Sequence, residues 1–226
     1  MKAVVRNVIL IAALLAAIGA ILLLTIQPRT GHEPVIATNT SEATTTQTIS
    51  DGTITFAYSS DEFGLAVTPE QVLVKSYIPP CDTDFNYCFY YIGTDYQGTN
   101  FESAGLRVKK RTDLSTQAAC LQTLPEGYTG ITAKVSTTAN FSTSVFSPLG
   151  DAGAGHYANG ALYRLAYKGS CYEFETRIGA TQYANFPRGT IKEFMPADQR
   201  AMEAKLLQLL KDITLPGGAR PFAKVS

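Results

Sequence analysis

Apolar residues form one long run near the start of the chain and recur in shorter patterns after it. The run, Val8 to Ile26, carries no charge and follows Lys2 and Arg6. A helix of this length is about 28 Å long, close to the thickness of the hydrocarbon core of a bilayer. We predict a single transmembrane helix over 8–26, and we place 1–7 in the cytoplasm because cations favour that side.

A removed signal peptide is the alternative interpretation of this segment. Signal peptides usually have a shorter apolar core followed by a small-residue cleavage site. This run is long and continues as LLLTIQPRTGHEP, without that pattern. We therefore expect an anchor that places the rest of the chain outside the cytoplasm, with the lipid bilayer as a partner of residues 8–26. Cleavage would instead release a secreted binding factor.

A Thr- and Ser-rich stretch separates the apolar run from the rest of the chain. Residues 27–50 include TNTSEATTTQTIS and few large apolar side chains. Such a segment cannot bury enough surface to offset the entropy lost on ordering. We predict a linker over 27–50, an extracytoplasmic domain over 51–215 and a disordered tail over 216–226.

Within 51–215 the apolar residues alternate with the period of two that half-buried strands require. The clearest hairpin is GALYRLAYKGSCYEFETRIG, where two alternating runs flank a turn at Lys168-Gly169-Ser170. Ile54, Phe56 and Tyr58 alternate in the same way. Further extended stretches are EFGLAV, QVLVKSYI, YCFYYIG, AGLRVKK, ITAKVSTT and STSVFS.

Two stretches have helical spacing instead. DLSTQAACLQTL predicts a short helix with Asp113 or Ser115 as its cap. PADQRAMEAKLLQLLKDITL predicts a long one, whose apolar residues form a single stripe. These residues are Met202, Leu206, Leu209, Leu210 and Ile213. The predicted fold is therefore α+β, an antiparallel sheet with a long C-terminal helix packed on one face.

The charge balance argues against one class of partner. The chain has 19 Lys and Arg and 19 Asp and Glu, for a formal net charge of zero. Nucleic acids need a cationic surface, so we expect no nucleic-acid partner. The nearest basic cluster is RVKKR, Arg107 to Arg111. We interpret it as a solvated strand end rather than an anion or lipid site.

The four cysteines all follow the predicted anchor, and an even number in an exported domain favours disulfides. Three pairings are open, and we favour Cys81 with Cys88 and Cys120 with Cys171. Zinc sites prefer closer cysteines or accompanying histidines. The stretch CDTDFNYC resembles the start of a calcium loop, but Tyr87 stands where glycine is needed. We expect no metal and no cofactor.

Catalytic motifs are absent from the sequence, which lacks G-x-S-x-G, H-E-x-x-H and P-loop patterns. His156, Glu173 and Glu175 are the best candidates for acid–base chemistry, although a structural histidine and a solvated strand face explain them as well.

An aromatic cluster offers a different kind of site. An exposed group of tyrosines could bind an envelope protein or a glycan, because tyrosine supplies rigid amphipathic contact area. The candidate binding surface consists of Tyr87, Tyr90, Tyr91 and Tyr96. Burial of part of this cluster in the core is the alternative.

One family resemblance is visible. FAYSSDEFGLAVTP, followed late in the chain by ALYRLAYKGSCYEFET and AKLLQLLKDITL, resembles PsbP-like domains over roughly residues 51–215. The resemblance implies an α/β/α-like sandwich over an antiparallel sheet. We infer only the fold from it, and no ligand-binding residues. This chain lacks tryptophan, which such domains often have after the proline.

These observations together predict a membrane-anchored extracytoplasmic domain with a non-catalytic binding or scaffolding role in the cell envelope. The alternative is an envelope hydrolase with a site near His156, Glu173 and Glu175.

Overall fold

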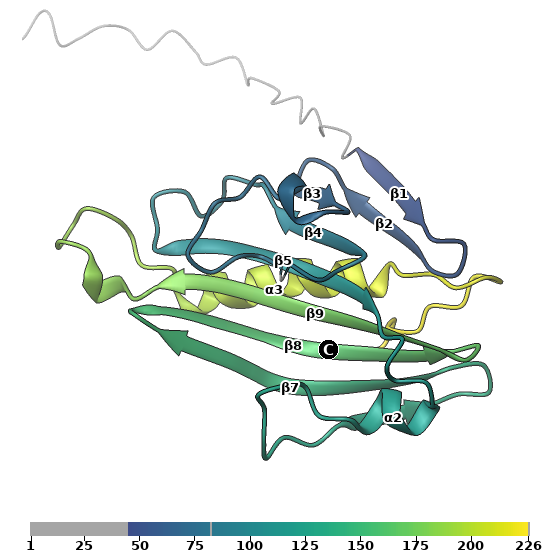
Figure 1. Ribbon diagram of the computed structural model, residues 1–226. Coiled ribbons are helices and arrows are strands. Elements are labelled where there is room, and N and C mark those ends of the chain that lie inside the picture. The colour runs from purple at the N-terminus through teal and green to yellow at the C-terminus, as the bar shows by residue number, and fades with distance from the viewer. Residues whose placement is uncertain (1–44, 82, 226) are drawn as a thin grey trace, which may run out of the picture. The chain divides into compact units, whose positions relative to one another are not determined.

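The computed structural model describes residues 45–81 and 83–225, which form one compact unit (Figure 1). The strands are β1 Thr46–Ser50, β2 Thr55–Ser59, β3 Phe63–Ala66, β4 Tyr87–Tyr91, β5 Phe101–Lys110, β6 Lys134–Thr137, β7 Ser142–Gly153, β8 His156–Tyr167 and β9 Ser170–Thr181. The helices are α2 Gln117–Gln122 and α3 Pro196–Lys211, with short 3₁₀ turns at Pro69–Gln71 and Tyr183–Asn185.

Seven strands form one antiparallel sheet in the order β3-β4-β5-β9-β8-β7-β6. The β8–β9 hairpin occupies its centre and is paired from His156 opposite Thr181 to Tyr167 opposite Ser170. Lys168 and Gly169 form its turn with φ of 47° and 73°, the positive values that a two-residue hairpin turn requires. The hairpin expected from the sequence is therefore confirmed.

The main core lies between the sheet and α3, which runs behind the sheet in the view of Figure 1. The helix buries the predicted stripe through Met202, Leu206, Leu209 and Leu210. The sheet meets it with alternate residues of its central strands, because successive strand side chains point to opposite faces. These residues include Leu106, Val108, Tyr163, Leu165 and Phe174. The α+β arrangement and the packed C-terminal helix are confirmed.

The second face of the sheet is covered in pieces. A strap, residues 72–81 and 83–86, crosses β5 and β9 where glycines leave room for it. A Cβ at Gly105 would lie 2.7 Å from the Pro80 carbonyl oxygen, and one at Gly179 would lie 2.5 Å from Ile78 Cγ2. The strap includes most of QVLVKSYI, which was expected to be a strand but has no strand partner in the structure.

The boundaries of the domain differ from those predicted. β1 falls inside the expected linker 27–50, yet it pairs with β2, from Thr46 opposite Ser59 to Ser50 opposite Thr55. The expected disordered tail 216–226 also belongs to the fold as far as it is described, since Phe222 is fully buried against Phe174. For residues 46–50 and 216–225 the structure differs from the expected linker and disordered tail, because tertiary packing supplies contacts that these segments lack on their own.

The predicted anchor 8–26, its cytoplasmic flank 1–7 and residues 27–44 of the linker lie outside the described residues. Within residues 45–81 and 83–225, no helix is long and apolar enough to cross a membrane.

Phe222→Ala tests whether the C-terminal segment is part of the core. Removing this buried ring should lower the free energy of unfolding by about 3–5 kcal/mol, because Phe222 packs against Phe174 and Tyr163. Lys224→Ala changes an exposed neighbour and should change the stability by less than about 0.5 kcal/mol. Denaturant unfolding measures both, and equal stabilities of the two variants would contradict the packing.

Candidate functional site

Two disulfides join the four cysteines as the sequence suggested. Cys81 is bonded to Cys88 across 7 positions, and Cys120 to Cys171 across 51. The first closes the end of the strap, and the second ties α2 to the start of β9. Disulfides persist in oxidising spaces, so this pairing indicates an extracytoplasmic domain.

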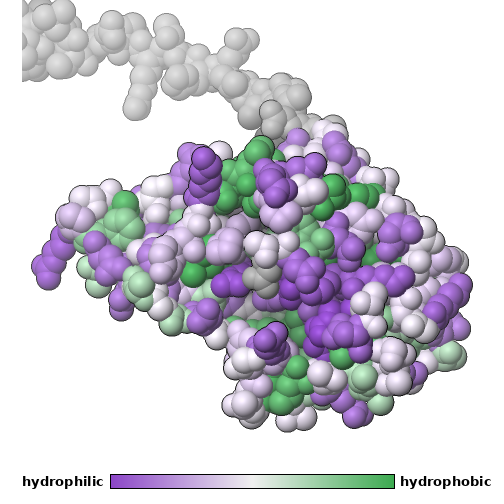
Figure 2. Space-filling view, in the orientation of Figure 1, coloured by the Kyte–Doolittle hydropathy of each residue, from purple (hydrophilic) through white to green (hydrophobic). Residues whose placement is uncertain are grey.

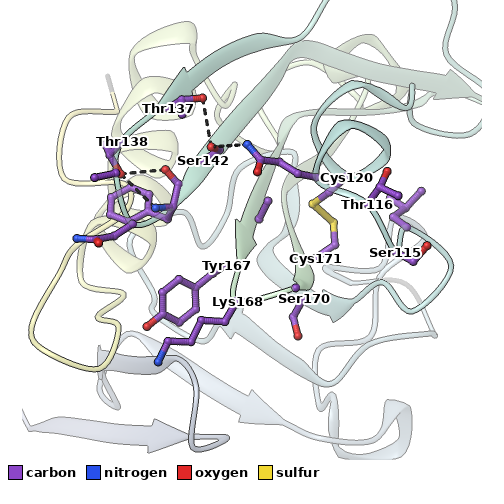
Figure 3. Close-up of a pocket in the computed structure, with 17 residues that line it drawn as sticks. Ser115, Thr116, Cys120, Thr137, Thr138, Ser142, Tyr167, Lys168, Ser170 and Cys171 are labelled. Carbon is purple, nitrogen blue, oxygen red and sulfur yellow. Dashed lines mark hydrogen bonds between the residues drawn. A yellow bond between two sulfur atoms is a disulfide. The ribbon is translucent and has the colours of Figure 1, made fainter.

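The Cys120–Cys171 disulfide forms one wall of a cavity of about 310 Å³ (Figure 3). The cavity lies at one end of the sheet, where three segments that are distant in the sequence meet. They are residues 114–120 with the start of α2, residues 137–142 with the β6–β7 turn, and residues 166–171 with the β8–β9 turn. We call this cavity the disulfide pocket.

Local hydrogen bonds fix the rim of the disulfide pocket. Thr116 caps α2, because its hydroxyl accepts from the Ala119 amide at 3.0 Å. The cap is therefore neither Asp113 nor Ser115, the two residues expected from the sequence. In the β6–β7 turn, the Thr138 hydroxyl donates to the Phe141 carbonyl at 2.9 Å. These local hydrogen bonds fix the start of α2 and the β6–β7 turn, and both segments line the disulfide pocket.

The side chains that line the disulfide pocket are mostly neutral and able to form hydrogen bonds. The Gln117 amide donates to the Ser142 hydroxyl at 2.9 Å, and this hydroxyl donates to Thr137 at 3.2 Å (Figure 3). Each hydroxyl keeps further capacity as donor or acceptor. Tyr167 and Lys168 are the only titratable side chains in the lining. This arrangement suits the binding of a polar molecule and offers no acid–base pair.

The predicted aromatic surface does not exist as an exposed group. Tyr90 and Tyr91 are each 4% exposed and Tyr96 is 9% exposed, while Tyr87 is half-buried. The Tyr91 hydroxyl donates to Asp95 at 2.9 Å, and burial with this carboxylate raises the pKa of Tyr91. Most of the cluster lies in the core because alternation turns Phe89 and Tyr91 toward α3, while the strap covers Tyr90.

The residues proposed for hydrolysis are not brought together. His156 pairs with Thr181, whereas Glu173 pairs with Arg164, eight positions further along β8. At about 3.3 Å per residue this separation is about 26 Å. Glu173 and Glu175 instead form ion pairs with arginines of the sheet.

His156 has a carboxylate partner that the sequence analysis missed. Its Nδ1 contacts Glu102, which also accepts from the Thr181 hydroxyl and from the Ile78 amide, at 3.0 Å for the amide. Tyr77 stacks on the imidazole with ring centroids 3.9 Å apart. Burial acts to raise the pKa of Glu102, but the hydrogen bonds from Thr181, Ile78 and His156 outweigh it and lower that pKa. Glu102 of β5 thus connects the strap, through Ile78, to His156 of β8 and Thr181 of β9.

The fold and these contacts define a disulfide-stabilised extracytoplasmic α+β domain with a neutral polar pocket. No family model and no curated protein matches the chain. Within the part of the chain that the structure describes, no group of three His, Cys, Asp or Glu side chains could hold a metal ion.

Removal of the disulfide that closes the longer loop should destabilise the domain more than removal of the other one. On the chain-entropy model, Cys120→Ala with Cys171→Ala costs about 4 kcal/mol, and Cys81→Ala with Cys88→Ala about 2.5 kcal/mol. Denaturant unfolding of the two double variants measures the difference. A greater loss from the shorter loop would contradict this assignment of their roles.

Glu102→Gln should change the pH dependence of stability. The pKa of Glu102 is lowered from its ordinary value of 4.5, so its contribution is present above pH 4.5 and is lost as the pH falls through the folded-state pKa. The penalty of Glu102→Gln should therefore be larger at pH 7 than at pH 3. Glu126→Gln, at an exposed carboxylate, is the control in unfolding experiments at both pH values. A penalty independent of pH would rule out this role.

Proposed function

We propose that this chain is a membrane-anchored binding protein of the cell envelope, and that its disulfide pocket holds a small polyhydroxylated ligand such as a saccharide unit. The observation that carries the proposal is the composition of the lining. Neutral hydroxyl and amide side chains from three separate segments surround one cavity. Groups of this kind fix the orientation of a polar ligand, and a volume of about 310 Å³ is within the range of small-molecule sites.

The remaining walls fit the same class of ligand. Phe141 and Tyr167 also line the cavity, and aromatic side chains offer an apolar body beside polar groups. Lys168 lies 5.2 Å from the centre of the Tyr167 ring and adds one positive charge at the rim. A sugar presents both hydroxyls and apolar C–H faces, so this mixture of walls suits it. A hydrolase would need positioned acid and base groups, which this lining does not supply.

The anchor over 8–26 and the resemblance to PsbP-like domains remain parts of this proposal. The antiparallel sheet with its C-terminal helix agrees with the resemblance at the level of architecture. The disulfides agree with a domain held outside the cytoplasm.

Gln117→Leu tests the pocket against a matched control on the same helix. Both Gln117 and Gln122 are exposed residues of α2, but only Gln117 lines the pocket. Saturation-transfer NMR with glucose, galactose and N-acetylglucosamine should detect binding to the full chain in neutral detergent. Gln117→Leu should weaken the bound sugar about tenfold, because a buried sugar hydroxyl loses its partner.

Gln122→Leu should leave that affinity unchanged. Equal effects of the two substitutions, or no transfer from any of the three sugars, would count against the proposal.

A further inference from the structure

Cations gather on the second face of the sheet, away from α3. Arg107 and Lys109 of β5 point to this face, while Val108 between them is buried in the main core. Register pairs Arg107 with Glu175 and Lys109 with Glu173 on β9. On the face seen in Figure 2, hydrophilic residues gather over the middle of the sheet. RVKKR is thus not simply a solvated strand end, because its alternate residues line a common surface.

One buried carboxylate holds three guanidinium groups on this surface. Glu173, 3% exposed, contacts Arg107 Nη2 at 3.1 Å through Oε1. Its Oε2 contacts Arg111 Nη1 at 2.8 Å and Arg164 Nε at 2.9 Å. Arg164 has no exposed surface. Glu173 offsets one of these positive charges, while Glu175 pairs with Arg107 at 2.5 Å and Asp113 pairs with Arg111. Glu173 also fixes the position of all three arginine side chains.

Glu173, Arg107 and Arg111 line a cavity of about 470 Å³, which we call the charged cleft. Four cations line it, Arg107, Lys109, Arg111 and Arg177, together with Glu126, Glu173 and Glu175. Outside the lining, Asp84 pairs with Lys109 and Asp113 with Arg111. The side chain of Asp84 is 74% exposed, and such an exposed ion pair is weak. Asp113 holds Arg111 more firmly, because Arg111 Nε and Nη2 donate to its two carboxylate oxygens at 2.8 and 2.6 Å. A ligand anion can therefore displace Asp84 from Lys109 and bind beside the guanidinium groups, each of which has five N–H donors.

One wall of the charged cleft is apolar. Leu124 and Pro125 come from the segment after α2, and Leu149 and Leu162 from β7 and β8. The cleft thus offers fixed positive groups at its floor and a hydrocarbon surface beside them. This combination selects an anion that carries an organic group rather than a bare inorganic ion.

We propose that the charged cleft binds the phosphate group of a small organic phosphate monoester. Guanidinium groups match phosphate oxygens through paired hydrogen bonds, and a lysine adds a point charge. The apolar wall receives the organic part. The site is separate from the disulfide pocket and does not depend on the function proposed for it.

Calorimetric titration of the full chain in neutral detergent tests this site. Phenyl phosphate should bind more tightly than inorganic phosphate, and phenol should not bind, because both the anion and the apolar group are needed. Glycerol 3-phosphate carries the same phosphate group on a polar organic group. It should bind more weakly than phenyl phosphate, and tighter binding of glycerol 3-phosphate would contradict the role of the apolar wall.

Two neighbouring lysines supply matched variants. Lys109 lines the charged cleft, whereas Lys110 is exposed on the opposite face, over the Tyr172 ring. Lys109→Gln should weaken phenyl phosphate about tenfold, through loss of one charge-assisted contact, and Lys110→Gln less than twofold. Circular dichroism checks that both variants fold. Equal weakening by the two variants, or no binding of phenyl phosphate at millimolar concentration, would overturn the proposal.

Discussion

The buried ion pair between Arg164 and Glu173 determines how the second face of the sheet is built. A guanidinium removed from water must regain charge compensation and hydrogen bonds inside the protein. Glu173 supplies the charge, and the carbonyls of Cys120 in α2 and of Thr123, the residue after α2, accept from Arg164. The short helix is therefore held over the sheet by electrostatics as well as by its disulfide. The disulfide pocket and the charged cleft lie at opposite ends of this helix. Both sites therefore depend on the ion pair between Arg164 and Glu173.

The spacing of apolar residues predicted the elements that bury only one of their faces in the main core. The C-terminal helix and the β8–β9 hairpin follow directly from the spacing of Leu206, Leu209 and Tyr163, because that spacing fixes which side meets the core. Alternation does not reveal a second covering layer. Leu162 and Arg164 are buried on the opposite face of β8, since distant segments pack there. The same reason accounts for Tyr90, which the strap covers.

The candidate sites were less predictable than the fold. The disulfide pocket combines three segments that share no local motif. Its one sequence signal was the expected bond between Cys120 and Cys171, which brings two of those segments together. The contact between His156 and Glu102 joins residues 54 positions apart, and only the strand register reveals it. The cationic floor was visible as RVKKR, but its function depends on residues from β9 and on the loop after α2.

The pairing of β1 with β2 has a mechanical consequence. Thr46 at the start of β1 lies opposite Ser59 at the end of β2, and Thr55 is bridged to Thr214 beyond α3. A pull applied at residue 45 would open this hairpin from its free end, one pair of hydrogen bonds after another, before it reached the seven-stranded sheet. The ribbon formed by β1 and β2 can thus yield under tension and lengthen the chain while the body of the domain stays folded.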